Sequence, residues 1–122
     1  MSIDVLLVDE DQDVLDIVST FLGREPDLSV TTETDPEAAL ERALDGEFDA
    51  VVSDYRMPRM SGVELCDAIR EAGNTIPFML FSARERDEVE AELESAGVTE
   101  FVQKGTGTDQ YTVLAEYIRD AV

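Results

Sequence analysis

The stretch DAVVSDYRMPRMSG, residues 49–62, decides how this chain folds. Residues 50–52 form a short apolar run that is bounded by polar residues and too brief for a helix, so a buried strand is predicted. Asp54 follows at the end of this run. In an open parallel sheet, ligands bind where the strands end, because strand ends and loops form a crevice there. Asp54 is therefore either a site residue or an ordinary solvated acid.

The second half of the stretch predicts the start of a helix. Pro58 is incompatible with a helix interior, so the residues after Asp54 form a loop. Ser61 and Glu64 match the S-x-x-E capping box, in which each side chain bonds the backbone N–H of the other residue. The predicted unit is a strand, a loop and a helix, with an acid at the end of the strand.

The rest of the chain repeats this alternation. Strands are predicted over residues 3–8, 28–32, 50–52, 78–81 and 101–102, and helices over 14–22, 36–44, 62–72, 85–96 and onward from Thr108 or Asp109. Alternating strands and helices predict an α/β fold, in which right-handed crossovers build a parallel sheet covered on both faces. The helix over residues 85–96 is mostly acidic with a thin apolar face, so we expect it to be the least firmly packed.

Length and composition narrow the class of protein. A chain of 122 residues is predicted to form one domain, residues 1–122. It contains no histidine, which excludes His-ligated metals and nucleophiles activated by histidine. The single cysteine, Cys66, is expected to be a small buried thiol. The first apolar run is too short for a signal peptide and nothing approaches a membrane span, so we expect a cytoplasmic protein without a membrane partner.

The formal charge is −20, from 29 acids and 9 bases. Such a surface repels phosphate backbones and anionic membranes, so direct nucleic-acid binding is not expected. The acids are distributed over all the predicted helices, and the 43% hydrophobic fraction is ordinary for a folded domain. The composition resembles that of a halophile's protein. We expect self-repulsion to destabilise the fold at low salt and screening to restore it.

Polar side chains follow several of the predicted strands. Asp9 and Glu10 follow the first strand, Asp54 the third, Ser82 the fourth and Lys104 the fifth. Parallel strands bring all of these residues to one edge of the sheet. Carboxylates placed close together repel one another unless a cation or a raised pKa relieves them. With oxygen ligands and no histidine, a hard ion such as Mg²⁺ is preferred.

Four motifs in order resemble one family. The stretches VDED, DYRMPRMSG, MLFSA and FVQK are similar to the motifs of receiver domains of the two-component response regulators, related to the chemotaxis response regulator. The likeness spans nearly the whole chain. It implies a flavodoxin-like, doubly wound, five-stranded parallel sheet flanked by five helices, with strand order 2-1-3-4-5.

The resemblance also implies a reaction. Asp54 is expected to accept a phosphoryl group from a phosphohistidine on a sensor histidine kinase or histidine phosphotransfer protein. Mg²⁺ is expected to be held by Glu10, Asp54 and the main-chain carbonyl of Arg56, with Asp9 assisting through water. The domain would catalyse its own phosphotransfer and slow dephosphorylation without turning over a metabolite, so it is a signalling domain and not an enzyme.

The same resemblance assigns the switch. Lys104 is expected to contact the phosphoryl oxygens, for which a compact ammonium suits better than the planar fork of Arg. Lys104 is the single lysine beside eight arginines. Ser82 is expected to bond the phosphoryl group and draw its loop inward, admitting the aromatic ring of Phe101, although Phe101 is equally compatible with a static core position. The surface of the fourth helix, fifth strand and fifth helix would then signal to a downstream effector protein or domain.

Some positions depart from the family pattern. Glu10 stands where a shorter Asp is usual, and Gly105 replaces a proline whose preceding peptide is cis in the family. Arg56 and Arg84 occupy variable positions that, by resemblance, affect the lifetime of the phosphate. Two such cations either shield the acyl phosphate from water or partly occupy the acidic pocket at rest.

Two other functions compete with the phosphorylation switch. One is a phosphohydrolase of the haloacid dehalogenase type, which requires a second acid two residues after the nucleophile, where this chain has Arg56. The other is an interaction module that has lost phosphorylation, which Glu10 alone favours.

Overall fold

The computed structural model describes residues 2–105 and 107–122. Its centre is a parallel sheet with the order β2-β1-β3-β4-β5. The strands are β1 (Ile3–Val8), β2 (Leu28–Glu33), β3 (Ala50–Ser53), β4 (Phe78–Ser82) and β5 (Glu100–Gln103). This is the strand order implied by the resemblance.

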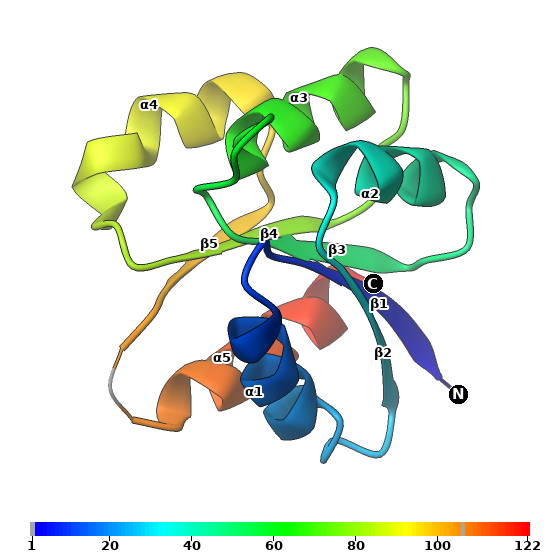
Figure 1. Ribbon diagram of the computed structural model, residues 1–122, viewed down its shortest axis with the longest axis vertical. Coiled ribbons are helices and arrows are strands. Elements are labelled where there is room, and N and C mark those ends of the chain that lie inside the picture. The colour runs from blue at the N-terminus through cyan, green and yellow to red at the C-terminus, as the bar shows by residue number, and fades with distance from the viewer. Residues whose placement is uncertain (1, 106) are drawn as a thin grey trace.

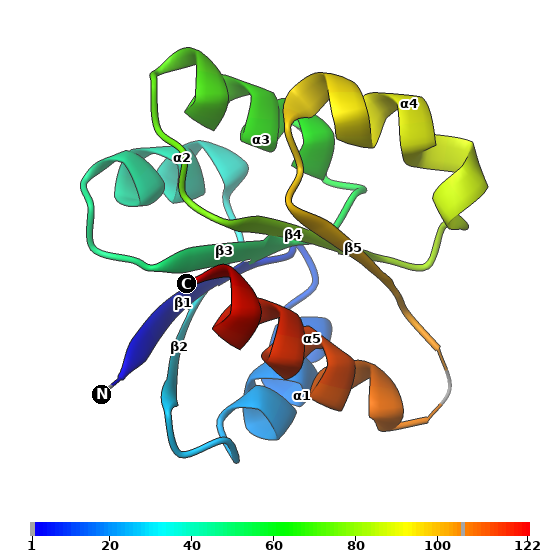
Figure 2. The ribbon, with the colours of Figure 1, turned by 180° about the vertical axis from the view of Figure 1, so that it is seen from behind.

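The helices lie on both faces of the sheet. They are α1 (Gln12–Leu22), α2 (Pro36–Leu44), α3 (Gly62–Glu71), α4 (Arg86–Ala96) and α5 (Asp109–Ala121). In Figures 1 and 2, α2, α3 and α4 cover one face, and α1 and α5 cover the other. The predicted doubly wound α/β fold is confirmed.

Each face of the sheet has its own hydrophobic core. In β1, Leu6 and Val8 pack beneath α2, α3 and α4, whereas Val5 and Leu7 pack beneath α1 and α5. Alternate side chains of a strand point to opposite faces, so a strand that is covered on both faces is apolar at nearly every position. This explains the uninterrupted apolar runs of the sequence.

The predicted element boundaries lie within two residues of the observed ones, and those of β1 and α2 match. Strands β3 and β4 each include a terminal serine, Ser53 and Ser82, both of which are buried. The apolar pattern stops before these serines, although the backbone ladder continues through them. Helix α3 ends one residue earlier than predicted, and Thr108 is the N-cap of α5.

Helix α4 buries the apolar face predicted for it, Val89, Leu93 and Ala96. Helices α1, α2 and α5 also bury three residues each, so the number of buried residues does not single out α4 as the least firmly packed helix. Cys66 is buried, its thiol donates to the carbonyl of Ala96 at 3.4 Å, and burial raises its pKa to about 11. In the described part of the chain, none of the helices has the length and apolar character needed to cross a membrane.

Candidate functional site

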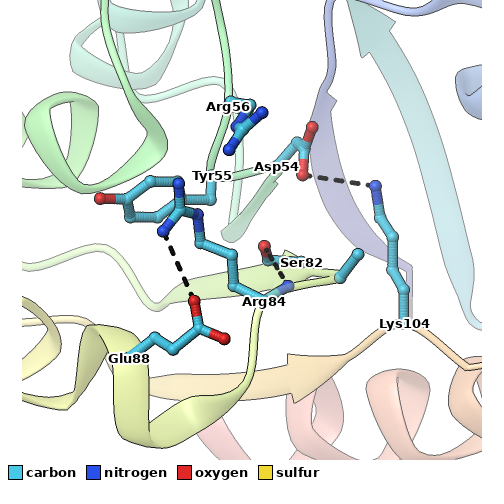
Figure 3. Close-up of a pocket in the computed structure, with 8 residues that line it drawn as sticks. Asp54, Tyr55, Arg56, Ser82, Arg84, Glu88 and Lys104 are labelled. Atoms are coloured by element: carbon cyan, nitrogen blue, oxygen red, sulfur yellow. Dashed lines mark hydrogen bonds and ion pairs between the residues drawn. The ribbon is translucent and has the colours of Figure 1, made fainter.

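The polar residues predicted to gather at one sheet edge do so around Lys104. Its Nζ lies 3.3 Å from Oδ1 of Asp54 and 3.4 Å from Oδ2 of Asp9 (Figure 3 shows the contact with Asp54). These three residues lie 45 to 95 positions apart in the sequence, and the parallel sheet brings them together. One ammonium therefore serves two carboxylates.

Backbone hydrogen bonds beyond the strand ends hold these residues in place. The N–H of Asp54 donates to the carbonyl of Val8 at 3.0 Å, and the N–H of Lys104 donates to the carbonyl of Ser82 at 2.8 Å. The sheet ladder thus continues to the site residues, although they follow the assigned strands. Their positions are set by the sheet and not by a free loop.

Asp54 is partly buried, with 17% of its side chain exposed. Burial raises the pKa of Asp54 above its usual value, the positive charge of Lys104 opposes this rise, and the nearby Asp9 adds to it. Asp9 is itself buried, and its Oδ1 accepts a hydrogen bond from the N–H of Asp11 at 2.9 Å.

A cavity of about 480 Å³ opens beside Asp54. It is lined by Asp54, Tyr55, Arg56, Ser82, Ala83, Arg84, Glu88 and Lys104. Three of the nine cationic residues of this acidic chain therefore line one cavity. Such a cavity favours an anionic ligand.

Within the described residues, neither Arg56 nor Arg84 forms an ion pair with Asp9 or Asp54. The guanidinium of Arg84 lies over the ring of Tyr55, 4.7 Å from its centroid, and Nη1 lies 3.6 Å from Oε2 of Glu88 (Figure 3). Arg56 lies at the cavity wall near Asp54. Arg84 thus borders the cavity while its guanidinium contacts Tyr55 and Glu88.

Ser82 and Phe101 are both buried. The Oγ of Ser82 accepts a hydrogen bond from the N–H of Arg84 at 3.2 Å, and its side chain borders the cavity. Phe101 belongs to the same core cluster as buried residues of α3 and α4. Ser82 therefore lies at the cavity wall beside Asp54, and Phe101 lies inward, as either a switch residue or a static core residue would.

The prediction that Asp9, Glu10 and Asp54 lie together is wrong for Glu10. It is exposed and lines another cavity, together with Asp35 and Arg59. Strand β1 ends at Val8 and the chain bends at Glu10, so the Glu10 side chain is exposed whereas that of Asp9 is buried beside Lys104. Across the described residues, no group of three or more His, Cys, Asp or Glu side chains is arranged to hold a metal ion.

The residues at the site nevertheless suit Mg²⁺. Asp9 and Asp54 supply carboxylate oxygens at one edge, on a partly buried wall of the cavity. Mg²⁺ in proteins is usually held by one or two carboxylates together with phosphate oxygens and several waters. The two aspartates therefore form a sufficient protein donor set, and Glu10 is not needed for the fit.

Two contributions to the site were not found from the sequence. A Cβ at Gly62 would overlap the carbonyl oxygen of Asp54 and lie 2.7 Å from Cδ1 of Leu80, so only glycine fits beside the Asp54 backbone. The hydroxyl of Tyr55 donates to Oε2 of Glu92 at 2.8 Å, which ties the loop after Asp54 to α4. The motif contains both Gly62 and Tyr55, but only the packing shows what they contact.

The loop after Lys104 is held by a side chain. The N–H of Gly105 donates to Oε1 of Gln110 at 2.8 Å, and Nε2 of Gln110 donates to the carbonyls of Gly105 and Gly107 at 3.2 and 2.7 Å. The described part of the chain contains no cis peptide bond. The peptide bond between Lys104 and Gly105 is therefore trans, whereas the bond before the proline usual at this position is cis.

Comparison with known proteins now places the chain. Residues 5–116 match the family model of the response regulator receiver domain. The chain belongs to this family. In structure, this receiver domain is similar to the chemotaxis protein CheY4 of Vibrio cholerae, with a TM-score of 0.85 and 25% identity, and the match covers 100% of both chains. Its assignment to the response regulators of two-component systems follows from the family.

Curated relatives are longer proteins. The receiver domain is 32% identical over 121 residues to a protein-glutamate methylesterase/protein-glutamine glutaminase of a Nocardioides species. The match covers 97% of this chain and 33% of the relative. It is 38% identical over 101 residues to the transcriptional regulatory protein PrrA of Mycobacterium tuberculosis. This match covers 82% of this chain and 42% of the relative. The chain thus spans between a third and a half of the length of these relatives.

Proposed function

We propose that Asp54 accepts a phosphoryl group and that the domain, residues 1–122, acts as a phosphorylation switch. The observation that carries this proposal is the Lys104 ammonium, which lies within 3.4 Å of both Asp54 and Asp9 at the mouth of a cationic cavity. The phosphodonor is a phosphohistidine on a sensor histidine kinase or a histidine phosphotransfer protein.

The reaction follows from the positions of the side chains. A carboxylate oxygen of Asp54 attacks phosphorus, the P–N bond to the donor histidine breaks, and the histidine nitrogen leaves with the electron pair. The attack brings an anion to an anion, so positive charge must be supplied. Lys104 already lies 3.3 Å from Oδ1 of Asp54, so its ammonium can follow the charge onto a phosphoryl oxygen. Ser82 supplies a hydroxyl donor from the neighbouring strand.

Mg²⁺ is the proposed cofactor. Asp9 and Asp54 would hold it, with the main-chain carbonyl of Arg56, and Glu10 would join after reorienting from its exposed position. When bound, Mg²⁺ supplies a divalent charge that offsets the repulsion between the carboxylate and the incoming phosphoryl oxygens. Asp9 and Asp54 would supply its carboxylate ligands from the partly buried wall of the site.

The proposed output is a change in the surface formed by α4, β5 and α5. A phosphoryl group adds charge and acceptor oxygens beside Ser82, whose buried position links it to the core that contains Phe101. To reverse a 1:99 equilibrium completely, phosphorylation must favour the active state by ~5.5 kcal/mol. The receiving partner is an effector protein or domain. With a charge of −20, the domain itself is proposed not to contact nucleic acid.

Intact mass spectrometry tests the proposal. The protein is incubated with Mg²⁺ and acetyl phosphate in molar KCl and compared with Asp54→Asn and with Asp67→Asn, a control at an exposed acid on α3. The expected result is one phosphoryl group on the unmodified protein and on the control, and none on Asp54→Asn. Absence of a mass gain in the unmodified protein would refute the switch. Continuous phosphate release over many turnovers would favour a phosphohydrolase instead.

A further inference from the structure

Arg84 has an unusual set of contacts for a residue that lines the cavity. It lies in the loop between β4 and α4, and three features describe its guanidinium. The planar group lies over the ring of Tyr55 at 4.7 Å, and Nη1 lies 3.6 Å from Oε2 of Glu88. Nε is buried, and within the described residues it has no hydrogen-bond partner. Arg84, which lines the same cavity as Asp54, therefore has a spare donor.

The contacts that hold Arg84 in this position are weak. The side chain of Glu88 is 54% exposed, that of Arg84 is 35% exposed, and their separation is long for an ion pair. Exposed pairs of this kind contribute little because solvent screens them. A buried N–H without a partner is also unfavourable. A strong acceptor in the cavity would therefore displace Glu88 from Arg84 easily.

A phosphoryl group on Asp54 is such an acceptor. It carries about −1.5 to −2 charges and three strong acceptor oxygens, compared with one charge on Glu88. Asp54 and Arg84 line the same cavity, and Figure 3 shows Arg84 on the side of Asp54 away from Lys104. Arg84 and Lys104 can therefore approach the group from two sides.

Resting on the proposed function, we propose that Glu88 is a positioning residue that competes with phosphorylated Asp54 for Arg84. In the unmodified domain, Glu88 holds Arg84 over Tyr55. After phosphorylation, Arg84 turns to the phosphoryl oxygens and Glu88 loses its cation. The strength of the Glu88 contact then sets how favourable the phosphorylated arrangement is.

This competition reaches α4 directly. Glu88 lies in the first turn of α4, whereas Glu92, one turn further along, holds the hydroxyl of Tyr55. Transfer of Arg84 breaks the contact of Glu88 with the β4–α4 loop and leaves in place the contact of Glu92 with Tyr55 in the β3–α3 loop. Because coupling is reciprocal, a partner that engages Glu88 on α4 would favour the phosphorylated state.

A double-mutant cycle tests the competition at equilibrium. The probe is beryllium fluoride, a phosphoryl mimic, titrated with Mg²⁺ in molar KCl and followed by ¹⁹F NMR. Glu88→Gln is expected to tighten binding about two- to fivefold, the range expected for loss of an exposed ion pair. Glu90→Gln on the same helix is the matched control and is expected to leave binding unchanged. Arg84→Gln is expected to weaken binding.

The decisive measurement is Glu88→Gln in the Arg84→Gln background. The tightening should disappear there, because Glu88 acts through Arg84. If it persists, a general effect of charge explains it and the inference is overturned. It is also overturned if Glu88→Gln matches Glu90→Gln. If the protein is phosphorylated normally but the effects of Glu88→Gln and Arg84→Gln on beryllium fluoride affinity simply add, this inference alone is refuted. If the unmodified protein neither binds beryllium fluoride nor gains a phosphoryl group, the proposed function is refuted as well.

Discussion

Helices α3 and α4 lie side by side on the same face of the sheet, but they are held differently (Figure 1). Helix α3 begins with a complete capping box between Ser61 and Glu64 and buries five residues. Helix α4 buries three residues and, in the part of the chain that the structure describes, has no side-chain cap at its N-terminus. Packing and capping therefore fix α3 more firmly than α4.

The same contrast holds for the contacts that the two helices make with the loop after β3, which contains Asp54 and Tyr55. The N–H of Gly62, the first residue of α3, donates to the carbonyl of Tyr55 at 2.8 Å, and its lack of a side chain lets the Asp54 backbone approach. Helix α4 reaches Tyr55 through the side chain of Glu92 and Arg84 through that of Glu88. Helix α3 therefore contacts the backbone around Asp54 directly, whereas α4 reaches Tyr55 and Arg84 through exposed glutamate side chains.

The largest expected difference is in the cores of the two helices. Leu65 of α3 is 0% exposed and Leu93 of α4 is 5% exposed. Leu65→Ala should cost about 3–5 kcal/mol and Leu93→Ala about 2–3 kcal/mol, because truncation of a fully enclosed side chain leaves the larger cavity. Denaturant unfolding in molar KCl measures both. Equal losses would contradict the contrast in packing.

Gly62 offers the next test. Gly62→Ala should destabilise the fold by about 1–3 kcal/mol, since the added carbon overlaps the Asp54 carbonyl and the Leu80 side chain. It should also slow phosphorylation by displacing the acceptor. Gly105→Ala is the matched control, because within the described residues no neighbouring atom lies within 4 Å of the added carbon. Unfolding curves and rates of mass gain that match between the two variants would refute the close approach at Gly62.

The helix caps should differ by a smaller amount. Ser61→Ala removes a side chain that accepts from the N–H of Glu64 at 3.1 Å and should cost about 1 kcal/mol. Glu85→Ala, at the corresponding position of α4, should change stability by less than about 0.5 kcal/mol, since Glu85 forms no capping bond within the described chain. The unfolding midpoint measures each. A comparable loss at Glu85 would show that α4 is capped after all.

The smallest effect concerns Tyr55. Its hydrogen bond to Glu92 raises the pKa of Tyr55 above the ordinary value of 10.0. Because folding raises this pKa, the contribution to stability is complete below about pH 10 and is lost as the pH rises through the folded pKa. Glu92→Gln should lower the pKa of Tyr55. Absorbance titration of the phenolate, with Tyr55→Phe as the reference, measures the change, and an unaltered titration would contradict the contact.

The sequence by itself determined the fold and the centre of the site. Short apolar runs alternating with helical patterns predicted a parallel sheet, and parallel strands must end at one edge, so Asp9, Glu10, Asp54, Ser82 and Lys104 were predicted to meet. The structure brings all of them except Glu10 together at this edge. Strand direction and the order of residues along the chain are sufficient to predict the edge, but they do not predict the direction of each side chain.

The tertiary structure alone decided which side chains contact one another around that centre. It turned Glu10 away from Asp54, enclosed Gly62 against the Asp54 carbonyl, and placed Arg84 between Tyr55 and Glu88. Such contacts depend on rotamers and on the spacing between helices packed on the same sheet. Neighbours of this kind lie up to 37 residues apart, as Tyr55 and Glu92 do, and no local pattern encodes their approach.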